Sequence, residues 1–387
     1  MKKLIFLFVV LFSMNVFSQH EENSIVVKDI ETQLPIENAI VFIMKTKQTL
    51  ISNKDGKVIF ALDGASSIQV SETNYEKVTI RWDALKPDLF VIYLKNNSNK
   101  LDEIVVSKEK PEKNLQKIIS NSRQKLANSY RLKVYVREFF MLDNKYSYYN
   151  DGLVNFQFEE NQNKSTTTLL VEQNRSYGLL EDEVSNDLMG YNLNNIMENY
   201  SNFKYFDPLL DSKTKKEYEF TTTGHPNNKN YYIMSVTPLD KSKKEFDTFE
   251  IIYDPIKKLI VEFSIIIKQA NLVQIEEQTK VGSKNITRSQ IKVSYRIDGE
   301  DYYLLSSNEE IAYDLILKDK VKNIQVRNNF ITTHFTRQNF TYSDSDVFKE
   351  KTLFNKKNKV MTKYWDISGF TATDEEKRLI DGLEFKM

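Results

Sequence analysis

Residues 25–107 constrain the fold most, because short β-branched runs alternate there with turn-forming residues. Runs of this kind between Gly, Pro, Asn and Asp are typical of strands. The predicted strands are residues 25–27, 40–43, 50–51, 58–60, 68–71, 78–80 and 90–94. Seven short strands in so short a stretch predict a β-sandwich.

A tight turn is predicted at Asp55 and Gly56, between the apolar runs 50–51 and 58–60. An Asp-Gly pair between two strands is a strong hairpin signal, because Gly readily adopts the positive φ that such a turn needs. We therefore expect the two flanking strands to pair with each other.

Three segments of this sandwich resemble the carboxypeptidase-regulatory-like family: 34–41 (LPIENAIV), 52–58 (SNKDGKV) and 71–75 (SETNY). Asn74 stands where that family usually has Gly, and Asn also tolerates positive φ. Residues 101–107 (LDEIVVS) are similar to the strand that follows this sandwich in TonB-linked outer-membrane receptors. The resemblance implies an accessory envelope domain over 19–107, and none of the catalytic or zinc-binding residues of carboxypeptidases is found.

Residues 1–18 have the organisation of a secretory signal peptide. Lys2 and Lys3 precede an apolar run over 4–12, which is too short for a stable membrane span. We expect cleavage between Ser18 and Gln19. The chain has no Cys, which excludes N-terminal lipid attachment and disulfide bonds. The sequence predicts an exported, non-lipidated protein of the periplasm or outer membrane, with no transmembrane segment after cleavage.

The charge balance gives no electrostatic case for nucleic acid as a partner. The chain carries 54 Lys and Arg against 54 Asp and Glu. A nucleic-acid surface normally requires a basic excess. The expected partner is instead an envelope protein, or a glycan or lipid of the cell surface.

A linker and an amphipathic helix are predicted over residues 108–130. Pro111 suits a first helical turn, and the apolar side chains that follow recur at helical spacing, at Leu115, Ile118, Ile119 and Leu126. This helix separates the sandwich from a second domain, 131–387.

The second domain returns to β periodicity. Residues 287–297 alternate apolar and polar side chains, and Asp298-Gly299 predicts a hairpin into the next strand. Another hairpin is expected around 254–258, a further strand at 272–281, and a weaker helix over 184–200. The fold class predicted for the whole chain is mainly β: the sandwich, the linker helix, and then a large antiparallel sheet or half-barrel with a few helices.

Segments at both ends of this domain resemble an uncharacterised domain that follows the same sandwich in bacterial envelope proteins. They are the helix 114–128 with 130–139, which contains YVREF, and 364–370 (YWDISGF) with the acidic helix 374–383. The resemblance implies a fold related to the lipoprotein-carrier half-barrel, a curved antiparallel sheet around an apolar cleft.

Two interpretations stay open for the apolar face of this sheet. It forms either a filled core or a cleft that admits an acyl chain, and a filled core is the more usual outcome. The cleft residues would be Val261, Phe263, Ile265, Ile291, Val293 and Tyr295. An aromatic group has the same two readings, sheet core or the lining of a cleft or glycan surface; its members are Tyr146, Tyr148, Tyr149, Phe156, Phe158, Phe203, Tyr205 and Phe206.

No catalytic, metal or cofactor site is predicted. His20, His225 and His334 lack a metal-ligand spacing, and the chain has no Gly-x-Ser-x-Gly elbow or Gly-rich phosphate loop. Adjacent acids such as Glu309 and Glu310 face opposite ways in a strand. The predicted function is therefore non-enzymatic envelope binding or scaffolding. The alternatives are a periplasmic carrier of an apolar or lipid ligand and a hydrolase that acts on cell-surface material.

Overall fold

The fold is taken from a computed structural model. It describes residues 22–62, 64–82, 90–96, 109–161, 164–178, 193–226, 228–239, 247–266, 276–278, 282–318, 320–350 and 352–384. The predicted signal peptide 1–18, its cleavage site at Ser18 and Gln19, and the predicted strand 101–107 lie outside these residues.

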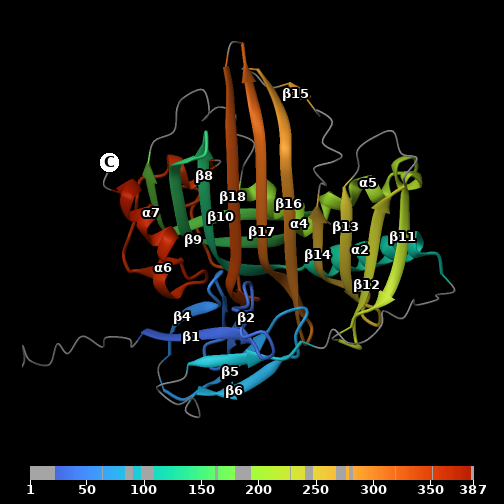
Figure 1. Cartoon of the computed structure of the whole chain (residues 1–387), viewed down its shortest axis with the longest axis horizontal. Coiled ribbons are helices and arrows are strands. Elements are labelled where there is room, and N and C mark those ends of the chain that lie inside the picture. The colour runs from blue at the N-terminus through green and yellow to red at the C-terminus, as the bar shows by residue number, and fades with distance from the viewer. Residues whose placement is uncertain are drawn as a thin grey trace, which may run out of the picture.

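The N-terminal part folds as two small β-sheets that enclose one core (Figure 1). One sheet has the order β4-β1-β7, and the other has the order β3-β2-β5-β6. Ile25, Val41 and Phe60 are fully buried between them. The predicted sandwich is thus confirmed, with β1 (Glu22–Asp29), β2 (Ile40–Ile43), β3 (Gln48–Ile51), β4 (Lys57–Ala61), β5 (Ser67–Ser71), β6 (Val78–Arg81) and β7 (Val91–Leu94).

The turn at Asp55 and Gly56 joins the two sheets and is not a β-hairpin. Gly56 has a φ of 70°, as expected, and its N–H donates to the carbonyl oxygen of Asn53 at 2.8 Å. However, β3 pairs with β2, whereas β4 pairs with β1. The hairpin prediction was wrong because an Asp-Gly pair specifies a local turn and not the sheet that the following strand joins.

One large antiparallel sheet dominates the rest of the chain. Its strands lie in the order β10-β9-β8-β18-β17-β16-β14-β13-β12-β11. Outside this order, β15 (Glu276–Gln278) pairs with β16. The hairpins predicted at Asp298-Gly299 and around 254–258 are confirmed. The strands are β8 (Tyr130–Leu142), β9 (Lys145–Asn161), β10 (Lys164–Gly178), β11 (Tyr218–Gly224), β12 (Tyr232–Pro238), β13 (Thr248–Asp254), β14 (Leu259–Ile266), β16 (Ser283–Asp298), β17 (Asp301–Leu317) and β18 (Lys320–Thr336).

Helices cover both faces of this sheet. The predicted linker helix is α2 (Pro111–Leu126), which buries Leu115, Ile118 and Ile119 in the main core. The same core takes side chains from α4 (Leu193–Asn202), η3 (Lys204–Phe206) and α5 (Asp207–Leu210), which precede η4 (Thr214–Glu217). None of the described helices is both long and apolar enough to cross a membrane.

The C-terminal helices pack on the opposite face, against β8 and β9. The side chains of β8 alternate, so that Val134 and Val136 enter the main core while Phe139 packs with Ile380 and Leu383. The helices on this side are α6 (Tyr364–Ile367) and α7 (Asp374–Glu384), whereas η6 (Leu353–Asn355) lies on the other face, where Leu353 joins the main core. Figure 1 shows α6 and α7 in red beside β8 and β9, with the blue sandwich below the long strands β16 to β18.

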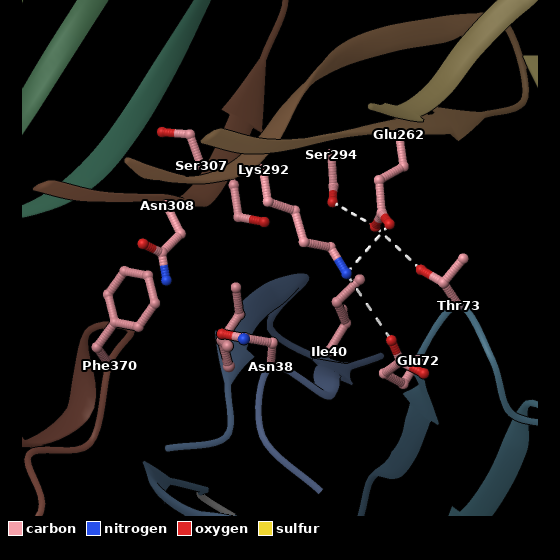
Figure 2. Close-up of a pocket in the computed structure, with 12 residues that line it drawn as sticks. Asn38, Ile40, Glu72, Thr73, Glu262, Lys292, Ser294, Ser307, Asn308 and Phe370 are labelled. Atoms are coloured by element: carbon pink, nitrogen blue, oxygen red, sulfur yellow. Dashed lines mark hydrogen bonds and ion pairs between the residues drawn. The ribbon is translucent and has the colours of Figure 1, made fainter. Parts of the chain in front are cut away.

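A charged cluster joins the sandwich to the large sheet (Figure 2). Lys292 Nζ lies 3.1 Å from Glu262 and 3.9 Å from Glu72 of the sandwich, and Thr73 Oγ1 donates to Glu262 at 3.0 Å. Burial opposes the charge of Lys292, but the carboxylates of Glu262 and Glu72 raise its pKa above the ordinary value. The cluster therefore stabilises one docked position of the sandwich.

Candidate functional site

A row of polar side chains crosses four adjacent strands on the face that carries α6 and α7. The strand register places its members directly opposite one another: Asn329 of β18, Arg137 of β8, Asp151 of β9 and Arg175 of β10. Along its strand, each of these residues is flanked by side chains that are largely buried. Charged groups in such a row must satisfy one another, because burying an unpaired charge is costly.

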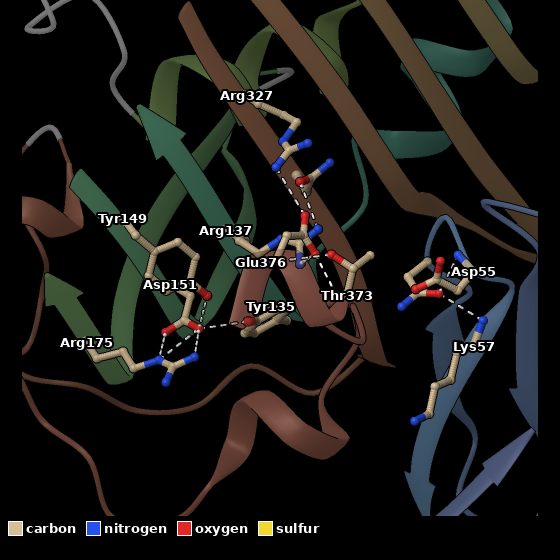
Figure 3. A network of polar contacts seen from close by, with 12 residues as sticks. Asp55, Lys57, Tyr135, Arg137, Tyr149, Asp151, Arg175, Arg327, Thr373 and Glu376 are labelled. Atoms are coloured by element: carbon tan, nitrogen blue, oxygen red, sulfur yellow. Dashed lines mark hydrogen bonds and ion pairs between the residues drawn. The ribbon is translucent and has the colours of Figure 1, made fainter. Parts of the chain in front are cut away.

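Asp151 is the centre of this row and is fully buried. Arg175 donates to its carboxylate from Nε at 3.0 Å and from Nη2 at 2.9 Å. Three tyrosine hydroxyls donate to the same carboxylate, those of Tyr135 and Tyr149 (Figure 3) and that of Tyr364. Burial, and then the Asp151 charge, raise the pKa of Tyr135 and of Tyr364. The carboxylate therefore acts as an anchor whose acceptor sites are occupied.

Arg137 is held less completely. Its Nη1 lies 3.4 Å from Glu376 of α7, its Nη2 lies 3.4 Å from Asn329 Oδ1, and its buried Nε has no hydrogen-bond partner among the described residues. Glu376 also pairs with Arg327 at 3.1 Å. Burial alone would raise the pKa of Glu376, but the guanidinium of Arg137 and the N–H of Thr373 lower it below the ordinary value.

A pocket of ≈ 250 Å³ opens beside Arg137 and Arg175. Three parts of the chain line it: β4 through Ile59, strands β8 to β10, and the C-terminal segment from Trp365 to Asp381. The guanidinium of Arg175 lies 3.8 Å from the ring centroid of Trp365, which positions that ring at the wall. The remaining lining residues are Tyr135, Arg137, Tyr149, Asp366, Phe370, Thr371, Ala372, Lys377 and Ile380.

Residues 367–371 connect the pocket wall to the sandwich. Gln48 Nε2 donates to the carbonyl oxygen of Ile367 at 2.6 Å, and Ile59 N donates to Thr371 Oγ1 at 2.9 Å. Gly369 has a φ of 140°, and a Cβ at this position would lie 2.4 Å from Ile331 Cγ2. The segment is thus fixed between the two domains, and the pocket forms only where they meet.

The structure places the six predicted cleft residues in two environments. Five lie in the main core: Phe263, Ile265, Ile291, Val293 and Tyr295. Val261 is only half-buried, because a bulge in the β13–β14 pairing puts Ile260 on the core side instead. Aromatic side chains from the segment after α4 cover this face, with Phe206 at 4.8 Å and Tyr205 at 6.1 Å from the ring of Phe263.

A buried acid lies at the edge of this core. Tyr200 Oη and Tyr205 Oη donate to Glu309 at 3.4 Å and 3.2 Å. Burial raises the pKa of Glu309 to about 7, against the opposing effect of the two hydroxyls. Glu310 faces the other way and pairs with Arg288. The described residues contain no group of three or more His, Cys, Asp or Glu that could hold a metal ion.

Sequence reasoning missed most of the pocket. Arg137 was noted only as part of a family motif, and Asp151 and Arg175 were not singled out. Of the aromatic group, Tyr149 lines the pocket, whereas Phe156, Phe158 and Phe203 fill the main core. A usable signal was present, since each strand from β8 to β10 carries charged residues within an otherwise buried run.

No family model matches the chain, and no curated protein matches it. Among solved structures, one described as "Lipid-protein interactions in lipovitellin" aligns over 58% of this chain and 27% of its own, with 10% identity and a TM-score of 0.24. The chain thus spans about a quarter of that lipovitellin chain. At this TM-score the alignment does not establish a shared fold.

Proposed function

We propose that this protein is an exported, non-enzymatic binding protein, and that the pocket between the sandwich, β8 to β10 and the C-terminal helices is its ligand site. The observation that carries the proposal is the composition of the pocket wall, to which all three parts contribute. Sites at the junction of two domains are a common location for ligands.

The chemistry of the lining supports binding rather than catalysis. Asp151 accepts hydrogen bonds from four side chains, and Glu376 is held by Arg137 and Arg327. A carboxylate whose acceptor sites are occupied is a poor general base, because it must first release a donor. This weighs against the hydrolase alternative at this pocket.

Packing favours binding at the junction over the lipid-carrier alternative. A carrier needs an open apolar cleft, but Tyr205 and Phe206 lie over Phe263, and Val293 is fully buried. Admitting an acyl chain would require these aromatic side chains to leave a close-packed core. The junction pocket is already open.

The family and the location stay part of the proposal. Two sheets around one core over 22–96 are the architecture that the carboxypeptidase-regulatory-like resemblance implies. The segments LPIENAIV and SNKDGKV, with the signal-like residues 1–18, support an envelope protein of the periplasm or outer membrane. Its partner would be a protein, glycan or lipid of that compartment.

A matched pair of charge reversals tests the site. Lys377 lines the pocket, whereas Arg378 is exposed on the same helix and is not part of the lining. Soluble fragments of envelope polysaccharide, peptidoglycan and lipid would be screened by thermal shift against the parent protein, Lys377→Glu and Arg378→Glu. We expect stabilisation by a ligand that Lys377→Glu reduces and Arg378→Glu retains. Equal stabilisation of all three proteins would place binding elsewhere.

A further inference from the structure

We propose that the junction pocket binds a sugar acid, that is, a single saccharide ring that bears a carboxylate. This proposal rests on the proposed function and specifies the chemical class of the ligand. It is carried by three properties of the pocket: an incompletely bonded buried arginine, a wall of aromatic rings, and a small volume.

The arginine is Arg137. Its side chain is only 8% exposed, its two polar contacts are both 3.4 Å long, and its Nε has no partner among the described residues. A guanidinium and a carboxylate normally approach to about 2.7–2.9 Å. Since a buried donor without an acceptor lowers stability, a carboxylate that enters the pocket would complete the hydrogen bonding of Arg137. Arg175 cannot take this role, because Asp151 already engages it from two atoms.

The charges around the pocket disfavour an anion that carries two charges. Arg137, Arg175 and Lys377 line it together with Asp366 and Asp381. Asp151 and Glu376 lie directly behind the two arginines. A phosphate, with nearly two negative charges, would be repelled by these four carboxylates more strongly than a carboxylate would.

The body of the ligand is indicated by the walls and the volume. Tyr149, Trp365 and Phe370 present aromatic rings to the pocket, and the C–H faces of a saccharide ring pack well on such surfaces. The ≈ 250 Å³ of space is enough for one saccharide ring and its substituents. Asp381 and Lys377 lie at the exposed rim, within the same pocket, where ring hydroxyl groups need acceptors and donors.

Trp365 provides a direct optical probe. The chain contains two tryptophans, and the other, Trp82, stacks on Phe90 within the sandwich. A Trp82→Phe protein keeps an aromatic ring there and leaves Trp365 as the sole indole. D-glucuronate and D-glucose would be titrated against this protein at neutral pH. The two sugars share one ring and differ only in whether C6 is a carboxylate or a CH₂OH group.

We expect saturable change of Trp365 emission with glucuronate, and an affinity for glucose at least about tenfold weaker, the ratio that one charge-assisted hydrogen bond gives. Arg137→Lys keeps the positive charge but removes the Nε donor and the planar fork. It should lose most of this preference while circular dichroism and the melting temperature show a folded protein. The comparison of the two sugars in the Trp82→Phe protein, with Arg137 intact, does not depend on Arg137→Lys, so it decides the matter alone if Arg137→Lys fails to fold.

Equal affinity for the two sugars, or the absence of saturable binding by glucuronate, would overturn the sugar-acid proposal. Acetyl-phenylalanine serves as the competing probe, because it carries a carboxylate on an aromatic body as a peptide terminus does. Suppose that acetyl-phenylalanine binds, that Lys377→Glu weakens this binding, and that glucuronate does not bind. The ligand class would then be wrong, and the pocket would remain the site. The proposed function itself fails if ligand binding is indifferent to Lys377→Glu.

Discussion

Arg175 holds the carboxylate of Asp151 from two nitrogen atoms, Nε at 3.0 Å and Nη2 at 2.9 Å, and neither residue is more than 7% exposed. The pair stands directly across β9 and β10. The Asp151 carboxylate accepts hydrogen bonds from Tyr135, Tyr149 and Tyr364 and so orients their rings. Of these tyrosines, Tyr135 and Tyr149 line the pocket.

Asp151→Asn is expected to lower the free energy of unfolding by about 3–5 kcal/mol, because it leaves the buried Arg175 without a counter-charge. The measurement is chemical denaturation followed by circular dichroism. Glu300, whose side chain is 85% exposed in its pair with Lys125, gives the control: Glu300→Gln should leave the midpoint essentially unchanged. The double change Asp151→Asn with Arg175→Met should recover part of the loss. A single Asp151→Asn protein as stable as the parent would show that the pair is not a structural anchor.

Gly56→Val should destabilise the protein by roughly 1–3 kcal/mol, since a side chain there is both strained and obstructed. The φ of Gly56 is 70°, and a Cβ would lie 2.4 Å from the carbonyl oxygen of Val27. Gly299 also has a positive φ, of 60°, but a Cβ there meets no atom within 4 Å. Gly299→Val therefore measures the backbone strain alone. If the two substitutions cost the same in thermal denaturation, the close contact with Val27 is not a source of instability.

The stability of the protein should depend on Glu309 between about pH 4.5 and about pH 7. Because its pKa is raised to about 7 in the folded state, the folded protein binds the proton more tightly than the unfolded chain does. Its stabilising contribution is therefore complete at acid pH and is lost as the pH rises to about 7. In Glu309→Gln this part of the pH dependence should disappear, which raises stability at pH 8 relative to the parent by an amount on the order of 1–3 kcal/mol. Identical pH profiles for the two proteins would contradict this account of Glu309.

Val293→Ala should cost roughly 1–4 kcal/mol if the apolar face of β16 is a filled core, because the truncation leaves a cavity. Val293 is fully buried, whereas Val321 is 62% exposed, so Val321→Ala is the matched control and should change stability little. A fluorescent fatty acid would be added to both proteins. Saturable binding that Val293→Trp weakens without loss of folding, together with a small cost for Val293→Ala, would favour the lipid-carrier alternative.

The sequence predicts much of the fold because period-two alternation and turn residues act locally. The alternation over 287–297 identified β16, and Asp298-Gly299 identified its hairpin with β17. The same local character explains the error at Gly56, where the turn was right and the pairing was wrong. Which sheet the strand after the turn joins depends on packing far from the turn.

The pocket was harder to predict, since its charged residues are separated along the chain and meet only through strand register. Arg137, Asp151 and Arg175 become neighbours because β8, β9 and β10 pair in one particular alignment. A shift of one residue would turn Asp151 to the other face of the sheet. The helical segment that closes the pocket, around Trp365, lies nearly two hundred residues further along the chain and gives no local sign of that contact.

The central claim is that ligands bind at the junction pocket, and fluorine NMR of protein labelled with 5-fluorotryptophan tests it most directly. The two tryptophans give one resonance each, Trp365 at the pocket and Trp82 in the sandwich core. Saccharide fragments released from cell envelopes should shift the Trp365 resonance in a saturable manner, leave the Trp82 resonance unchanged, and lose this effect in Lys377→Glu but not in Arg378→Glu. A shift confined to Trp82, or no shift of Trp365 at saturating concentrations of a fragment that binds, would contradict it.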